Sequence, residues 1–156
     1  TQFKSSIDST LNYLKKNSVD DQTRLLFLIY DIEKNLIGHI GIANVKNNCG
    51  ELDNMMRGNH GGSKDLIYFA EISILKWCFN YLNLKEIYLR VLSFNKVTIN
   101  IHLKSGFNFL NKIYLYKKEE KNLIEHLEVN EKNSNVKYFL QKMNLSKKSF
   151  LINEKK

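Results

Sequence analysis

Acidic and histidine side chains occupy positions from which they could move protons between reactants. Glu51 and Asp53 stand two residues apart in a strand-like stretch, so both carboxylates project from one face. In such a pair one carboxylate can have a raised pKa and accept a proton from a reactant. His102 follows in a short helix-like stretch, and histidine can donate a proton near neutral pH. The alternatives are carboxylates that only face solvent and a histidine that only packs against the core.

A polar, glycine-bearing loop at 57–65 (Arg-Gly-Asn-His-Gly-Gly-Ser-Lys-Asp) is the second place where chemistry is expected. It lies between a predicted strand and a long predicted helix, whose first N–H groups have no partner within the helix. With the helix dipole they form an anion site suited to a pyrophosphate, and Arg57 and Lys64 add positive charge. His60 could contact the substrate or a phosphate. The spacing fits neither a P-loop nor a dinucleotide fingerprint, and the loop could also be a flexible connection.

Hydrophobic periodicity and turn residues predict the elements that must position these side chains. The longest helix is expected at 66–82, with Leu66, Ala70, Ile74, Trp77, Cys78 and Tyr81 on one side. Helices are also predicted at 5–16 and 95–104, and strands at 24–31, 36–45, 51–56, 86–92, 107–117, 123–129 and 136–145. This order predicts an α/β protein with a mixed sheet and helices on its faces.

Length and composition favour a single soluble domain. The 156 residues are 43% apolar and carry a net charge of +8. We expect one domain at 1–146 and a solvated basic tail at 147–156. The longest apolar run, Leu25 to Tyr30, is too short to cross a bilayer, and Cys49 and Cys78 fit reduced thiols in a cytoplasmic protein. The scattered lysines form no basic stripe interleaved with aromatic residues, so no nucleic-acid partner is expected. The two cysteines do not make a zinc site, so no bound metal is expected.

The segment from Glu86 to Phe107 resembles the end of the GNAT superfamily core. The family pattern is Asn, two residues, a small residue, Ile, two residues, Tyr, and then Lys-x-Gly-Phe. In this sequence the matching positions are Asn95, Thr98, Ile99, Lys104, Gly106 and Phe107. The likeness extends over about 24–110. It implies a GNAT-like acyl-CoA N-acyltransferase fold and an acetyl-CoA-dependent N-acetyltransferase.

The resemblance also implies roles for individual residues. Acetyl-CoA would lie between the strands at 51–56 and 86–92, with its acetyl group passing directly to a primary amine. Glu51, aided by Asp53, would accept the amine proton, and His102 would protonate the CoA sulfur where the family usually has tyrosine. His60 would contact the substrate. The expected cofactor contacts are Met55, Met56, Arg57, Gly61, Gly62, Ser63, Lys64, Asn95 and Lys104.

Two departures from the family pattern bear on these expectations. The family's phosphate loop has a glycine where this chain has His60. The family also places a strand and a helix before the hairpin, whereas only a helix is visible here, so the first strand is expected to be missing.

The acceptor amine is predicted from weaker resemblances. The stretches at 112–118 and 135–145 resemble members that acetylate nucleotide-linked amino sugars for surface polysaccharides. A protein or peptide amine is the alternative acceptor. A catalytically inert CoA-binding module and a homodimer also remain open.

Overall fold

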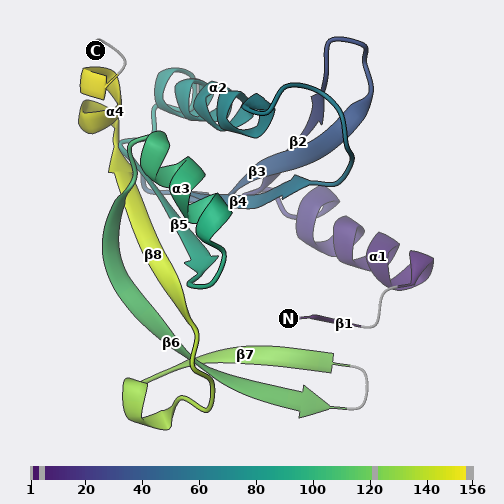
Figure 1. Cartoon of the computed structure of the whole chain (residues 1–156), viewed down its shortest axis with the longest axis vertical. Coiled ribbons are helices and arrows are strands. Elements are labelled where there is room, and N and C mark those ends of the chain that lie inside the picture. The colour runs from purple at the N-terminus through teal and green to yellow at the C-terminus, as the bar shows by residue number, and fades with distance from the viewer. Residues whose placement is uncertain (1, 4–5, 121–122, 154–156) are drawn as a thin grey trace.

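One mixed sheet of eight strands forms the centre of the computed structural model of this chain, which describes residues 2–3, 6–120 and 123–153 (Figure 1). The strands are β1 (Gln2–Phe3), β2 (Leu25–Tyr30), β3 (Leu36–Lys46), β4 (Cys49–Arg57), β5 (Glu86–Leu92), β6 (Asn108–Glu120), β7 (Leu123–Val129) and β8 (Phe139–Ser146). Their order across the sheet is β1-β7-β6-β8-β5-β4-β3-β2, and β4–β5 is the one parallel pair among the described strands. The mixed α/β sheet expected from the sequence is confirmed.

The helices lie against the strands from two sides. They are α1 (Ile7–Leu14), which continues as a π-helical turn at Lys15–Val19, α2 (Leu66–Asn80), α3 (Lys96–Lys104), the short 3₁₀ turn Glu131–Asn133 and α4 (Lys147–Asn153). In Figure 1, α2 lies above β2, β3 and β4, and α1 lies below them. Helix α2 connects β4 to β5, as a parallel pair requires.

The core lies between the sheet and helices α2 and α3. Leu75 and Phe79 of α2 are fully buried against Ile42 of β3 and Ile87 of β5. Ile99 of α3 joins the same cluster. Alternate residues of β5 face this core, so Ile87, Leu89 and Val91 are buried while Tyr88, Arg90 and Leu92 project from the opposite face.

The buried face of α2 differs from the predicted one. The sequence predicts Tyr81 on the apolar side, but this residue ends the helix and is 79% exposed. The residues that α2 buries are Ile67, Glu71, Ile74, Leu75, Cys78 and Phe79. A carboxylate, Glu71, therefore lies on the core side of this helix.

The prediction of a solvated tail from residue 147 is wrong for 147–153. These residues form α4, and Phe150 is buried with its ring centroid 5.2 Å from that of Phe79. Lys147 donates a hydrogen bond to the Phe79 carbonyl oxygen. Residues 154–156 of the predicted tail lie outside the described residues. Packing against α2, which a charge-rich sequence does not reveal, is the reason for the difference.

The remaining boundaries follow the sequence closely. The predicted strands at 86–92 and 123–129 match β5 and β7, and the helix predicted at 95–104 is α3 with Asn95 as its N-cap. Ser5, predicted to begin the first helix, lies outside the described residues. Strand β1 pairs with β7 at the far end of the sheet, so among the described strands nothing pairs with the outer edge of β2.

Candidate active site

The parallel strands β4 and β5 separate after a short paired stretch. They pair from Cys49 to Glu51 and from Glu86 to Tyr88, and no further pairing follows along the described strands. Asn54 has a φ of 51°, and the register between β3 and β4 shifts between His39 and Gly41. This irregularity bends β4 away from β5. A cleft therefore opens between the two strands.

The cleft contains a cavity of about 380 Å³. Beyond Glu51, the N–H and C=O groups of β4 that face β5 have no strand partner, because the two strands are no longer paired there. These groups can bind an extended chain that contains amides. These features fit the pantetheine arm of acetyl-CoA, and the predicted contacts Met55 and Met56 both lie in the wall. The lining residues are His39, Leu52, Asp53, Asn54, Met55, Met56, Leu89, Arg90, Val91, Leu92, Asn95, Thr98, His102 and Leu140.

The glycine-bearing loop precedes α2 as expected. Asp65 occupies the N-cap but makes no side-chain cap bond, so N–H groups of the first turn are available to an anion. Gly62 has a φ of 64°, and an added Cβ would lie 2.6 Å from Leu66 Cδ2. Arg57 donates hydrogen bonds to the carbonyl oxygens of Gly61 and Ser63, so it closes the loop on itself. His60 and Lys64 are exposed, and neither lines the cleft.

Two predicted cofactor contacts have other partners within the protein. Asn95 caps α3 by accepting a hydrogen bond from the Thr98 N–H at 3.3 Å. Lys104 pairs with Asp65 at 3.1 Å and lies 4.0 Å from the centroid of the Tyr68 ring. Only Asn95 of these two lines the cleft, so a direct contact of Lys104 with the cofactor stays a prediction.

His102 lies in the wall of the cleft, and it has a partner that the sequence did not reveal. Its Nδ1 lies 3.0 and 3.1 Å from the two carboxylate oxygens of Glu71. Both residues are buried, with exposed fractions of 4% for His102 and 0% for Glu71. The edge of the His102 ring also meets the ring of Phe107, with centroids 5.7 Å apart. The imidazole is therefore held on two sides.

Glu51 and Asp53 lie in a recess of about 350 Å³ on the sheet face opposite α2. Glu51 accepts hydrogen bonds from Arg90 Nε at 2.7 Å and from Asn44 Nδ2 at 2.7 Å. Asp53 pairs with Arg24 at 2.5 Å. Asp53 lines both the recess and the cleft, whereas Glu51 lines only the recess. The two carboxylates predicted to act together thus have different access to the cleft.

Hydrogen bonds, burial and charged neighbours shift the pKa values of Arg90, Tyr88 and His126 in and near the recess. The hydrogen bond from Arg90 to Glu51 raises the pKa of Arg90 above its usual value and keeps the guanidinium charged. Burial, followed by the negative charge of Glu51, raises the pKa of Tyr88. Burial lowers the pKa of His126, whose Nε2 lies 2.8 Å from the Tyr138 hydroxyl oxygen. His126 is therefore mainly neutral at pH 7.

Four residues of the site were not predicted from the sequence to be functional: Glu71, Arg90, His126 and Glu128. The last three lie in the recess but come from β5 and β7, 36 to 38 residues apart, so no local spacing connects them. Glu71 did have a detectable signal. It follows Ile67 by four residues and precedes Ile74 by three, a spacing that places it on the same helix face as these buried residues.

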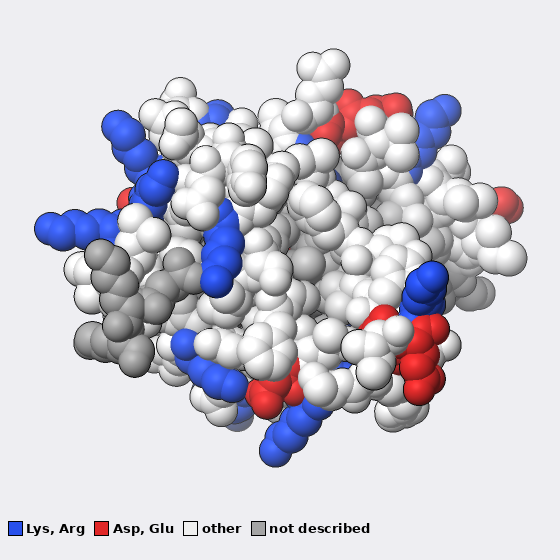
Figure 2. Space-filling view, turned by 90° about the horizontal axis from the view of Figure 1, so that it is seen from above, with Lys and Arg blue, Asp and Glu red and all other residues white. Residues whose placement is uncertain are grey.

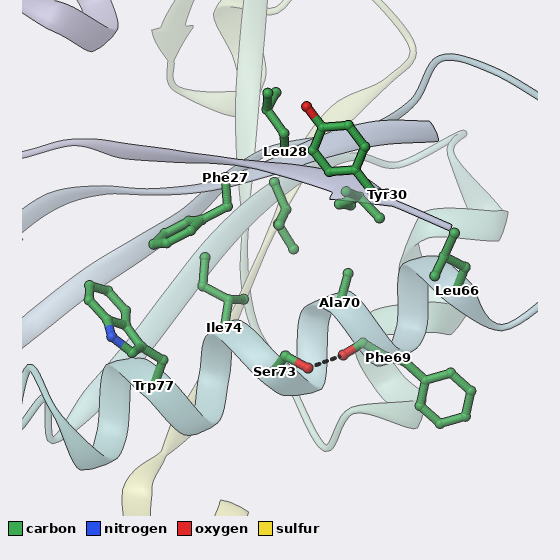
Figure 3. Close-up of a pocket in the computed structure, with 11 residues that line it drawn as sticks. Phe27, Leu28, Tyr30, Leu66, Phe69, Ala70, Ser73, Ile74 and Trp77 are labelled. Atoms are coloured by element: carbon green, nitrogen blue, oxygen red, sulfur yellow. Dashed lines mark hydrogen bonds between the residues drawn. The ribbon is translucent and has the colours of Figure 1, made fainter. Parts of the chain in front are cut away.

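A larger hollow of about 480 Å³ lies between β2 and α2 (Figure 3). Phe27, Ile74 and Trp77 meet there, and the rings of Phe27 and Trp77 are 5.3 Å apart edge to face. The hydroxyl of Ser73 donates to the Phe69 carbonyl oxygen in the same helix. Among the described residues, no acidic, basic or histidine side chain lines this groove.

One face of the molecule shows how charged side chains are distributed around its edge. On the face seen in Figure 2, basic and acidic side chains are dispersed around the rim, and much of the centre is uncharged.

Within the described residues no group of three or more His, Cys, Asp or Glu side chains could hold a metal ion. No described helix has the length and apolar character needed to span a membrane.

The parallel strands β4 and β5 separate next to the glycine-bearing loop that precedes α2. This arrangement is typical of transferases that bind an acyl-CoA. The family profile of the acetyltransferase (GNAT) domain matches residues 1–108. The chain belongs to this family and is an acetyl-CoA-dependent N-acetyltransferase. No curated protein matches it significantly by sequence.

Solved structures agree on the fold. A spermidine N-acetyltransferase from Vibrio cholerae, in complex with CoA and spermine, superposes with a TM-score of 0.71 at 20% identity, covering 95% of this chain and 79% of that one. Mutant forms of the spermidine/spermine N-acetyltransferase from the same organism give a TM-score of 0.72 at 19% identity, covering 97% and 80%. At such identities the likeness concerns the fold alone.

Proposed function

We propose that the acceptor is a small aliphatic amine carrying more than one positive charge, such as a polyamine, and that it binds in the recess. The observation that carries this proposal is the charge of the recess lining. In a protein with a net charge of +8, the lining contains three carboxylates, Glu51, Asp53 and Glu128, against one guanidinium, Arg90. With Arg24, which pairs with Asp53 from outside the lining, the five side chains still carry one net negative charge. Such a lining attracts alkylammonium groups. Leu92, Leu115 and Leu140 supply apolar contact for a methylene chain.

The reaction brings the amine from the recess to the thioester in the cleft. Asp53 lines both spaces, so it is the better candidate to accept a proton from the amine, directly or through water. Glu51 is held by Arg90 and Asn44 and contributes negative charge. The amine nitrogen forms a bond to the acetyl carbon as the carbon–sulfur bond breaks. One proton leaves the nitrogen, and one is supplied to the sulfur by His102.

A nucleotide-linked amino sugar, the acceptor predicted from the sequence, is the second candidate. It is favoured by Arg90 and Lys142, which are register partners on β5 and β8 and project from the same sheet face. Two cations there could meet a diphosphate. Arg90 is engaged by Glu51 and Glu128, however, which makes the amino sugar the weaker candidate.

The test measures release of the free CoA thiol from acetyl-CoA with a panel of amines. Spermidine and other polyamines should give turnover that exceeds the rate with nucleotide-linked amino sugars and with peptide N-termini. Turnover with an amino-sugar nucleotide alone would overturn the polyamine proposal and support the second candidate. Stabilisation by acetyl-CoA without turnover on any amine would indicate an inert binding module.

A further inference from the structure

Glu71 is a buried carboxylate that the proposed mechanism does not yet use. It lies in the middle of α2, is fully buried, and has its two oxygens 3.0 and 3.1 Å from Nδ1 of His102. No other hydrogen-bond or ion-pair partner of this carboxylate is found among the described residues. A carboxylate that is buried without a proton or a cation beside it strongly destabilises the folded state. The pair must therefore hold a proton between Glu71 and Nδ1.

A proton on Nδ1 determines what the other ring nitrogen can do. A neutral histidine has one N–H, so the hydrogen bond to Glu71 makes Nε2 the free nitrogen of the ring. When the ring is doubly protonated, Nε2 carries a proton that it can transfer. A carboxylate that orients a histidine in this way is the arrangement found in Ser-His-Asp triads.

The second ring nitrogen is open to the cleft. His102 lines the cleft, and no hydrogen bond to Nε2 occurs within the part of the chain that the structure describes. In that same part, Arg24 Nε is the only buried side-chain nitrogen or oxygen without a hydrogen-bond partner. Nε2 is therefore not enclosed by the core, and the edge contact with Phe107 keeps the ring from turning.

We propose that Glu71 is a positioning residue that keeps a proton on Nδ1 of His102 and thereby presents Nε2 to the cleft, where its proton passes to the leaving CoA sulfur. This inference rests on the proposed role of His102 as the acid. The Nε2–H bond breaks as the S–H bond forms, and Nε2 regains a proton from solvent when the products leave. The other charged or titratable groups lining the cleft are His39, Asp53 and Arg90, and Lys104 with Asp65 lies near the end of α3.

The kinetic test uses Glu71→Gln, which keeps the shape of the side chain and removes its charge. We expect kcat to fall by about tenfold to a hundredfold. The KM for acetyl-CoA should stay within about threefold. Ser73→Ala, an exposed change on the same helix, is the matched control and should leave both unchanged. An unchanged kcat would overturn the proposal, and the ring tautomer measured below separates this role from a purely structural one.

A second measurement is made on the wild-type protein and does not depend on activity. The chain has four histidines, so ¹⁵N-histidine spectra can be assigned with single His→Gln variants. Wild-type His102 should carry its proton on Nδ1 across neutral pH. Finding Nδ1 unprotonated, with the proton on Nε2 alone, would refute the role of Glu71. If the spectra agree but His102→Phe retains full turnover, the acid role of His102 fails instead.

Discussion

The cleft and the recess lie on the two sides of the same pair of strands, yet they are built from different kinds of contact. The cleft is lined by apolar and polar side chains in equal number and by free backbone of β4, and the buried Glu71 holds His102 in its wall. The recess is lined by ion pairs that join β4, β5 and β7. From this difference we propose that the donor is recognised mainly by shape and backbone and the acceptor by charge.

The largest expected effect concerns the donor side. Replacing His102 by phenylalanine preserves much of the ring volume and removes the proton donor. We expect kcat to fall by about a hundredfold, because general acid catalysis typically contributes that much. The KM for acetyl-CoA should change by less than about threefold. Equal losses in kcat and in acetyl-CoA affinity would mean that His102 binds the cofactor and does not act as the acid.

Substitution of Asp53 tests the position that the cleft and the recess share. Asp53→Asn keeps an oxygen for the hydrogen bond from Arg24 and removes the basic carboxylate. We expect kcat/KM for the amine to fall by about thirtyfold, with the loss greatest near neutral pH, where the amine must give up a proton. Glu51→Gln should cost less, since Glu51 does not line the cleft. If Glu51→Gln has the larger effect, the two roles are reversed.

Arg90 should matter more for stability than for the chemical step. Arg90→Met leaves Glu51, which is 5% exposed, without its cation, and we expect a loss of about 2–3 kcal/mol in the free energy of unfolding. The double variant Arg90→Met/Glu51→Gln should recover at least half of that loss. Chemical denaturation of Arg90→Met, Glu51→Gln and the double variant measures the losses in the free energy of unfolding. Additive losses would mean that the pair is not energetically coupled.

His126 should give the smallest effect, visible in the pH dependence of stability. Burial holds the pKa of His126 below its ordinary 6.5, so the unfolded chain binds a proton at a higher pH than the folded protein. Stability should therefore fall as the pH is lowered through about 6.5. His126→Gln should flatten the slope between pH 7.5 and 5.5 and can still bond to Tyr138. An unchanged slope would mean that other groups cause the pH dependence of stability.

The same contrast explains what the sequence could predict. The cleft depends on local signals: the N-cap at Asn95, the stop at Gly106 with its φ of 98°, and the strand–loop–helix around residues 57–65. These predict the fold and the donor side within one contiguous segment. The recess joins Glu51 to Arg90 and Glu128, which are 39 and 77 positions away, and only the strand order brings them together. No local pattern carries that information.

Two further differences have physical reasons of the same kind. Lys104 fits the family motif, but Asp65 offers it a carboxylate within the protein. Glu71 was overlooked because a single glutamate in an apolar helix suggests a solvated position, although its spacing from Ile67 and Ile74 places it inside. A buried acid at core spacing predicts a buried partner, and here that partner is His102.

The measurement that tests the central claim most directly is the pair of KM values in Glu128→Gln. Glu128 lies in the recess, is 55% exposed on its side chain, and pairs with Arg90 at 3.0 Å. Glu125→Gln, from the opposite face of the same strand, is the control. We predict that the KM for spermidine rises about fivefold, the equivalent of about 1 kcal/mol, while the KM for acetyl-CoA stays within twofold. A rise in the KM for acetyl-CoA with an unchanged KM for spermidine would contradict the assignment of donor and acceptor to the two sides.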